Sequence, residues 1–342
     1  MIVAKFGGTA ITPNNLHFVK NIITHHHGAV VVSAIGKQFD GDTKVTDLLK
    51  ALHSRLPDTS LFDKIAFKYR SLVEQNDISI DINAILKDTI TNIVQQNYYE
   101  NTLSKGEELS AKVVAAFLGW KYVSAESLFR FGSRRLLGKE TLKNISSVEG
   151  RFVTGGFYGA RKDGRRVLFP RGGSDISAGI VAAALDASLY ENWTDVNGLC
   201  IADPTKVNGA ETVRCVSYSD MRLLAQCGAT VLHPDSVLPA ARKAIPINIR
   251  NYFNTSDCGT VVCNDSLPNQ VLGVTARRNG NLYCTTIVFT LPHSVVAEAI
   301  YCMLKHADIH PMGVTGASNH LQLITVENIL SAVYDVVMKL TS

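Results

Sequence analysis

The residues best suited to chemistry form a short glycine-rich segment, RGGSD, at positions 171–175. An apolar run at 167–169 precedes it, and apolar residues at helical spacing follow it, so the pattern predicts a strand, a loop and a helix. Two glycines let the backbone approach a ligand closely, Ser174 can cap the helix, and the first-turn N–H groups favour an anion. Because Asp175 is itself negative, an anion bound here requires a cation, which Arg171 can supply.

A second polar loop follows the expected helix. Residues 188–193 predict another strand, which ends in the sequence TDVNG at 194–198, a turn with a carboxylate and an Asn-Gly pair. A strand, loop, helix, strand and loop in this order form the βαβ unit of a parallel sheet. Both polar loops then lie at the carboxyl ends of strands, where open α/β sheets bind ligands.

The beginning of the chain has the same plan. A strand at 2–6 leads into Gly7-Gly8-Thr9, a helix at about 13–24 and a strand at 28–33. Backbone N–H groups of the two glycines could cradle phosphate oxygens, while Lys5 could neutralise a phosphoryl group in transfer. A surface lysine before an ordinary turn explains this motif alone equally well.

Five motifs in this order resemble the core of aspartate kinases in the amino-acid kinase superfamily. They are KFGGT at 5–9, KGEELS at 105–110, RGGSD at 171–175, WTDVNG with ADP between 193 and 204, and GATVLHP at 228–234. The resemblance implies ATP-dependent phosphorylation of the side-chain carboxylate of L-aspartate to 4-phospho-L-aspartate, the first step of the aspartate-family amino acid pathway. It also implies Mg²⁺, because ATP carries it.

The resemblance further implies a role for individual residues. Arg171 would clamp the substrate α-carboxylate with its planar fork, Glu107 would pair with the α-ammonium, and Asp175 would orient Lys5 or a magnesium-bound water. The implied set is catalytic Lys5 and Asp175; phosphate-binding Gly7, Gly8 and Thr9; substrate-binding Ser33, Ala34, Thr46, Glu107, Arg171 and Ser174; nucleotide-binding Thr194, Asp195, Cys200, Asp203 and Lys206; and no metal ligand.

Two of these residues have simpler explanations from the sequence alone. Thr46 could merely cap the next helix. Glu107 is expected in the first turn of a helix at 104–117, where a glutamate commonly only complements the helix dipole. The charged segment RKDGRR at 161–166 has an Asp-Gly centre and predicts a hairpin whose charges are solvated.

The nucleotide segment departs from the family pattern at three positions. Cys200 stands where many members have an aromatic residue, and Thr205 follows Asp203-Pro204 where an arginine is usual, with Lys206 adjacent as a substitute. Thr230 occupies a position that is lysine in some members. These departures affect the expected ATP affinity but leave the charges that act on the phosphoryl group.

Composition narrows the class of protein. The 342 residues are 46% hydrophobic with a net charge of +4, and the basic residues form no long run, so no nucleic-acid partner is implied. No apolar run approaches a membrane span or a signal peptide, so we expect a cytoplasmic protein without a membrane partner. Seven cysteines without a C-x-x-C pair argue against a disulfide framework and a zinc site.

The predicted fold is α/β in two domains. Residues 1–265 are expected to form an amino-acid kinase-like three-layer α/β/α domain with a mainly parallel sheet. The resemblance implies that helices between 47 and 117 sit over the edge of this sheet as a substrate lid. Residues 266–342 predict strand (284–289), helix (294–304), strand (310–315), strand (320–325) and helix (326–340), which resembles a small α+β ACT-type regulatory domain, single and truncated where the family usually has two. Its uncovered sheet edges predict a homodimer. Because effector pockets in the family lie between paired modules, the resemblance implies weak or no inhibition by lysine and threonine.

Two alternative functions stay open. One is a kinase for another amino acid or carboxylate in the same superfamily. The other is a non-catalytic regulatory subunit that binds a full-length kinase or an amino acid through its tail. Retention of Lys5, Gly7, Gly8, Arg171 and Asp175 argues against a subunit without activity.

Overall fold

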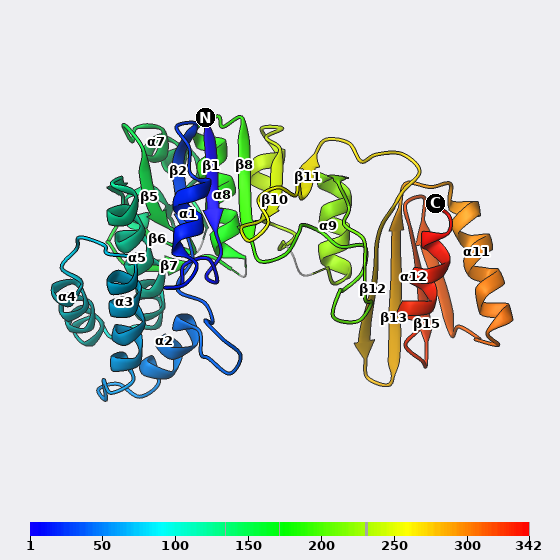
Figure 1. The fold of residues 1–342 in the computed structure, drawn as a ribbon, viewed down its shortest axis with the longest axis horizontal. Coiled ribbons are helices and arrows are strands. Elements are labelled where there is room, and N and C mark those ends of the chain that lie inside the picture. The colour runs from blue at the N-terminus through cyan, green and yellow to red at the C-terminus, as the bar shows by residue number, and fades with distance from the viewer. Residues whose placement is uncertain (134, 171, 230–231, 342) are drawn as a thin grey trace.

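A computed structural model describes residues 1–133, 135–170, 172–229 and 232–341. Arg171 and Thr230, two positions singled out from the sequence, therefore lie outside the described residues. The molecule is elongated, with a large α/β body that contains the N-terminus and a small module that contains the C-terminus (Figure 1). Within the described residues, no helix combines the length and apolar character needed to cross a membrane.

The large body is built on an eight-stranded sheet with the order β3-β5-β2-β1-β8-β10-β11-β9. Its pairs are parallel except for β10 with β11. The strands are β1 (Ile2–Phe6), β2 (His27–Val32), β3 (Lys121–Tyr122), β5 (Phe152–Gly155), β8 (Leu189–Thr194), β9 (Cys215–Ser217), β10 (Ile247–Asn251) and β11 (Thr260–Cys263). Buried residues fill β2 completely, as expected for a parallel strand covered on both faces.

Side-chain alternation along the central strands divides the core into two layers. Val3 of β1 packs with the residues of α7 (Gly138–Ser146), α8 (Gly173–Ala184) and α10 (Leu238–Ala241), whereas Ala4 and Phe6 pack with those of α1 (Leu16–Ile22) and α5 (Tyr99–Leu118). Helices therefore cover both faces of the sheet. The predicted three-layer α/β/α architecture is confirmed.

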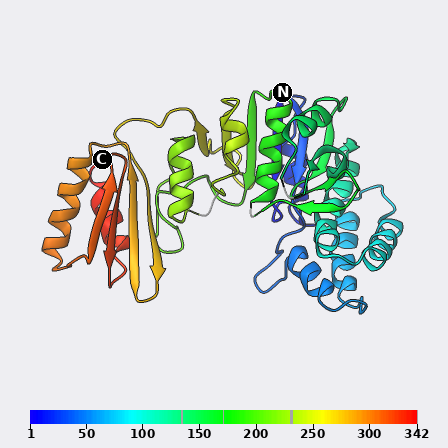
Figure 2. The ribbon, with the colours of Figure 1, turned by 180° about the vertical axis from the view of Figure 1, so that it is seen from behind.

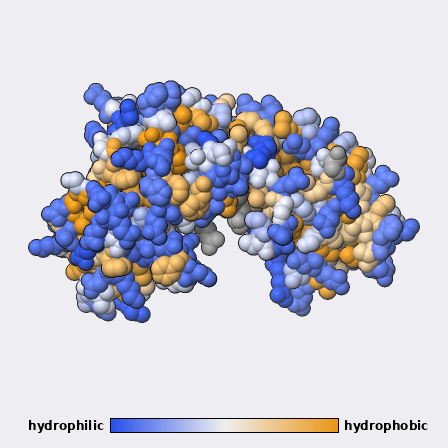
Figure 3. Space-filling view, in the orientation of Figure 1, coloured by the Kyte–Doolittle hydropathy of each residue, from blue (hydrophilic) through white to orange (hydrophobic). Residues whose placement is uncertain are grey.

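Three further helices form a lobe beside the carboxyl ends of the strands: α2 (Val45–His53), α3 (Phe62–Gln75) and α4 (Ile82–Gln95). The surface is hollowed between this lobe and the C-terminal module (Figure 3). A small second sheet contains β4 (Arg130–Phe131), β6 (Tyr158–Arg161) and β7 (Arg166–Leu168), preceded by the short α6 (Ala125–Leu128). The antiparallel pair β6–β7 confirms the predicted hairpin.

The C-terminal module has a four-stranded antiparallel sheet with the order β12-β13-β15-β14. Its elements are β12 (Val271–Asn279), β13 (Leu282–Phe289), α11 (His293–His306), β14 (Gly313–Ala317), β15 (His320–Thr325) and α12 (Leu330–Met338). Seen from the front and from behind, α11 lies at the end of the molecule farthest from the large body (Figures 1 and 2). The sequence analysis missed β12, because its second half is exposed and rich in arginine.

The module contacts the large body mainly through β12 and α9 (Tyr218–Cys227). The Thr275 hydroxyl donates to the carbonyl of Cys227 at 2.9 Å. Asn319, in the turn between β14 and β15, donates to Oδ1 of Asp220 at 3.1 Å. Polar bonds at separate points therefore fix the module against α9.

Candidate active site

Lys5 and Asp175 meet at the carboxyl end of the central strands. Lys5 lies on β1 and its Nζ is 2.7 Å from Oδ1 of Asp175, in the first turn of α8. Asn192 of β8 pairs with Lys5 in the sheet register, and its Oδ1 accepts from Lys5 Nζ at 3.3 Å while its Nδ2 donates to Asp175 at 3.1 Å. A cation, a carboxylate and an amide thus form one closed network, of which the sequence analysis missed Asn192.

The loops after β1 and β2 approach each other through glycines. A Cβ atom on Gly8 would lie 2.4 Å from the carbonyl oxygen of Ala34, and one on Gly36 would lie 2.7 Å from the backbone of Gly8. The Gly36 N–H donates to the Gly8 carbonyl at 2.8 Å. Side chains at either position would separate the two loops, so the glycines hold Ser33 and Ala34 beside the 7–9 turn.

Glu107 is a buried carboxyl group in the middle of α5, not in a first turn as predicted, because the helix begins at Tyr99. Gly106 lets the helix pack against Ala34: a Cβ atom there would lie 2.7 Å from that of Ala34. Burial raises the pKa of Glu107 to about 8, and backbone N–H groups, including that of Ala34, oppose the rise only in part. Its Oε2 has no hydrogen-bond partner among the described residues.

The end of β5 separates Glu107 from the first turn of α8. A Cβ atom on Gly155 would lie 3.1 Å from that of Glu107, and one on Gly156 would lie 2.7 Å from the Cα of Ser174. Ser174 therefore borders the same region. The prediction that it caps α8 is wrong, because Gly172 occupies the N-cap with φ of +73°. Phe157 follows at φ of +74°, held by a 3.0 Å bond from its N–H to the Ser177 hydroxyl.

Thr9 lies in the turn after β1, and Thr46 lies at the start of α2. The carbonyl of Thr9 accepts from Asn15 Nδ2 at 2.9 Å, which fixes the turn after β1. Thr46 lies in the first turn of α2, whose N-cap is Lys44, so Thr46 does not cap the helix. The first turn of α2 is tied to the loop after β2 by a bond from the Val45 N–H to the Ile35 carbonyl at 3.1 Å.

All the predicted nucleotide residues line one cavity of about 350 Å³, a volume within the range of small-molecule sites. Thr194 and Asp195 lie at its β8 end, next to the 7–9 turn, since the Gly7 N–H donates to the Trp193 carbonyl. Cys200 is half-buried, and burial raises the pKa of its thiol. The full lining is Thr194, Asp195, Val196, Gly198 to Lys206, Leu224, Gly228, Ala229, Gly273 to Ala276 and Leu330.

Asp203 and Lys206 form the exposed rim of this cavity. Hydrogen bonds from Thr205 lower the pKa of Asp203; the Thr205 hydroxyl donates to it at 2.6 Å. Lys206 Nζ lies 3.4 Å from the same carboxylate, with about half of its side chain exposed. Lys206 is therefore held at the rim but can still turn toward an anion.

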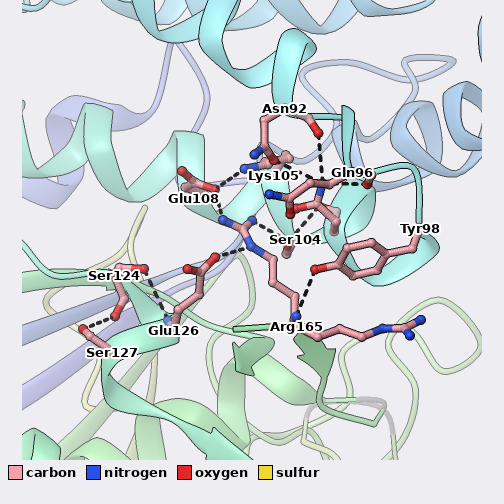
Figure 4. Close-up of polar contacts among 12 residues, drawn as sticks. Asn92, Gln96, Tyr98, Ser104, Lys105, Glu108, Ser124, Glu126, Ser127 and Arg165 are labelled. Carbon is pink, nitrogen blue, oxygen red and sulfur yellow. Dashed lines mark hydrogen bonds and ion pairs between the residues drawn. The ribbon is translucent and has the colours of Figure 1, made fainter. Parts of the chain in front are cut away.

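A buried cluster of charges braces the helix that carries Glu107 (Figure 4). Glu108 accepts from Arg166 at 2.7 Å, Lys112 at 2.8 Å and Lys105 at 2.9 Å. Burial alone would raise the pKa of Glu108, but these cations hold it well below its usual range. Arg166 also pairs with Glu126.

The prediction that the charges of the 161–166 hairpin are solvated is therefore wrong for Arg166. Arg166 is 8% exposed and its Nη1 donates to Ser104 of α5. Arg165 stacks its guanidinium over the ring of Tyr98. The cluster ties α5, which carries Glu107, to Arg166 at the start of β7.

Comparisons with known proteins point to the same family as the sequence motifs. The model of the amino acid kinase family matches residues 1–251. Aspartokinase 3 of Bacillus subtilis (strain 168) is 32% identical over 301 residues, covering 80% of this chain, and the chain spans 66% of the length of that relative. The resemblance to aspartate kinases is confirmed by these matches.

Two solved structures share the fold. The crystal structure of Clostridium acetobutylicum aspartate kinase superposes with a TM-score of 0.90 at 22% identity, over 100% of both chains. E. coli aspartokinase III in complex with aspartate and ADP superposes with a TM-score of 0.73 at 24% identity, over 97% of this chain and 80% of that one. The predicted combination of a kinase-like body with a small C-terminal module is thus a known arrangement.

Proposed function

The chain belongs to the amino acid kinase family, and from that premise we propose that it transfers the γ-phosphoryl group of ATP to the side-chain carboxylate of L-aspartate. The observation that carries the substrate assignment is Glu107, a buried carboxyl group with an unpartnered oxygen. An unpaired carboxylate in a buried site costs several kcal/mol unless a cation meets it. The α-ammonium of an amino acid is such a cation.

Lys5 would act on the phosphoryl group. Its ammonium lies on the carboxyl end of β1, oriented by Asp175 and Asn192, so it meets developing negative charge without having to move. Backbone N–H groups at Gly7, Gly8 and Thr9 would donate to the phosphate oxygens. Phosphoryl transfer of this kind depends on positioning and charge neutralisation, and the aspartate nucleophile needs no base because a carboxylate is ionised at neutral pH.

The remaining predicted residues would complete the two substrate sites. Ser33, Ala34, Thr46 and Ser174 would surround the aspartate, with Arg171 on its α-carboxylate. Thr194, Asp195, Cys200, Asp203 and Lys206 would hold the nucleotide, consistent with their common cavity. E. coli aspartokinase III, which shares the fold, has been crystallised with aspartate and ADP.

Magnesium would arrive with ATP. The described residues contain no group of three or more histidine, cysteine, aspartate or glutamate side chains that could hold a metal ion. Mg²⁺ in kinases is usually bound by phosphate oxygens and one or two carboxylates, and Asp175 and Asp195 fit that need. When bound, the ion would neutralise charge on the phosphates, while Asp175 would hold a magnesium-bound water or Lys5.

A homodimer would cover the open edges of the C-terminal sheet. β14 is an edge strand whose residues are mostly exposed, and exposed edges favour pairing with another chain. A closed two-fold dimer is the simplest cover.

The test is an aspartyl-hydroxamate assay with ATP and magnesium, in which L-aspartate is compared with other amino acids and carboxylates. Hydroxamate with L-aspartate alone is the expected result. Product with a different amino acid would replace the substrate and keep the kinase. No ADP release with any acceptor, from a folded protein, would favour a non-catalytic regulatory subunit.

A further inference from the structure

The C-terminal module contributes a wall to the cavity that holds the predicted nucleotide residues. Gly273, Val274, Thr275 and Ala276 of β12 line it, together with Leu330 of α12. These residues lie beyond the 1–251 region that the family model matches. The cavity therefore closes only when the module is docked on the large body.

β12 is an edge strand, and its free edge faces the cavity. The Val274 N–H donates to the carbonyl of Ile201, in the loop after β8, at 2.5 Å. Backbone groups alternate between the two sides of an antiparallel strand, and the register with β13 is regular from Val274 to Asn279. The N–H and C=O of Ala276 therefore point to the same edge as the Val274 N–H.

Helix α9 packs against one face of β12 and fixes the position of the strand. The Thr275 hydroxyl bonds to the Cys227 carbonyl at 2.9 Å, and Gly273 packs so closely that a Cβ atom would lie 2.3 Å from Leu224 Cδ2. The backbone of Ala276 thus faces the cavity from a strand that bonds to Ile201 at its edge and to α9 through one face.

The cavity has two ends of different character. Thr194 and Asp195 lie near the 7–9 turn and Lys5, so the backbone N–H groups and the ammonium at this end suit phosphates. The β12 end combines apolar side chains, such as Ile201, Leu224 and Leu330, with the backbone donor and acceptor of Ala276. An apolar slot with one backbone donor and one acceptor suits the flat, hydrogen-bonding edge of a nucleotide base.

We propose that the free edge of β12 is the base-binding wall of the nucleotide site, and that the Ala276 backbone bonds to the purine of ATP or ADP. This rests on the nucleotide site proposed above and adds the module to it. Nucleotide binding then favours the docked module, and a docked module favours nucleotide binding, because such coupling is reciprocal.

Proline substitution tests the backbone donor directly. Proline removes an N–H and is tolerated at edge positions where that N–H faces away from the sheet. Ala276→Pro should weaken ADP binding by about fivefold, the effect of one hydrogen bond, measured by calorimetry on the full chain with magnesium. Arg278→Pro is the matched control: its N–H points to the same edge, but it does not line the cavity.

Amide hydrogen exchange gives a second readout on the unmodified protein. Addition of ADP should slow exchange in residues 271–279 and leave β14, at the opposite edge, unchanged. If Ala276→Pro does not fold, the exchange measurement on the unmodified protein decides by itself. Equal ADP affinity in Ala276→Pro, Arg278→Pro and the unmodified protein, or unchanged exchange in 271–279, would overturn the proposal.

These measurements need neither aspartate nor turnover, so they separate this proposal from the proposed function. A chain that binds ADP through β12 but phosphorylates no aspartate would refute only the assigned substrate. A chain that phosphorylates aspartate with an ADP affinity indifferent to Ala276→Pro would refute only the base-binding wall.

Discussion

Glu107→Gln should make the protein more stable and less active at once. The fully buried carboxyl has a pKa of about 8, against an ordinary value of 4.5. The folded state therefore keeps a proton that the unfolded chain loses, and the free energy of unfolding falls as pH rises from 4.5 toward 8. Each unit of pH in this window costs about 1.4 kcal/mol, or about 3 kcal/mol in total by pH 7.

Glutamine has nearly the same shape as the protonated side chain and cannot ionise. The variant should therefore gain up to about 3 kcal/mol over the unmodified protein at pH 7 and almost nothing near pH 4. Denaturant unfolding at the two pH values measures the difference. Glu149→Gln is the control, since this residue is exposed and its replacement should change stability by less than about 0.5 kcal/mol.

The same carboxyl group should make aspartate binding depend on pH. With a pKa of about 8, about a tenth of the molecules carry the carboxylate at pH 7, and only this form can pair with an ammonium. The KM for aspartate should fall by about tenfold between pH 6 and pH 7 and level off above pH 8. Glu107→Gln should bind aspartate weakly at every pH and lose this slope.

Two results would refute the reasoning. A KM for aspartate that is flat between pH 6 and pH 8 would show that Glu107 does not bind the ammonium. A Glu107→Gln variant no more stable than the unmodified protein at pH 7 would show that the ionised side chain finds a partner in the unliganded state. Either outcome would remove the buried carboxyl group as the basis for the substrate assignment.

Three further predictions concern the phosphoryl site, the charge cluster and assembly. Lys5→Ala should lower kcat by about a hundredfold, with little change in the KM for aspartate; an unchanged kcat in steady-state assays would exclude Lys5 from catalysis. Arg166→Met should destabilise the protein by about 3–5 kcal/mol in denaturant unfolding, because Glu108 stays buried with fewer cations; a smaller loss would mean that Lys105 and Lys112 suffice. Light scattering at micromolar concentration should give the mass of a dimer, because a partner would cover the exposed edge strand β14; a monomer would contradict the edge-strand argument.

The sheet was predictable in part because β2 and most of β1 are apolar. β2 is buried along its whole length, as a continuous apolar run predicts for a strand of a parallel sheet. β12 was not predictable in the same way. Its first four residues are buried, whereas Arg277, Arg278 and Asn279 extend into solvent. The sequence of β12 therefore shows neither a continuous apolar run nor an alternation of apolar and polar residues along its whole length.

For charged residues, burial was harder to predict than secondary structure. RKDGRR does form a hairpin, but Arg166 is buried because α5 brings Glu108 and Ser104 to it from a distant part of the chain. Likewise, Glu107 was placed in a first turn because the helix was expected to begin at Ser104. The helix instead begins at Tyr99, and its buried face, not its end, carries the carboxyl group.

Asn192 illustrates what only the strand order can reveal. In the sequence it is one polar residue in a strand, separated from Lys5 by most of the large body, and no motif includes it. Once β1 and β8 are neighbours in parallel register, Lys5 and Asn192 lie side by side and face the same layer as α8. Asp175, at the start of that helix, then meets both. The motifs therefore identified the charges of the site, while the register supplied the neutral amide that holds those charges in position.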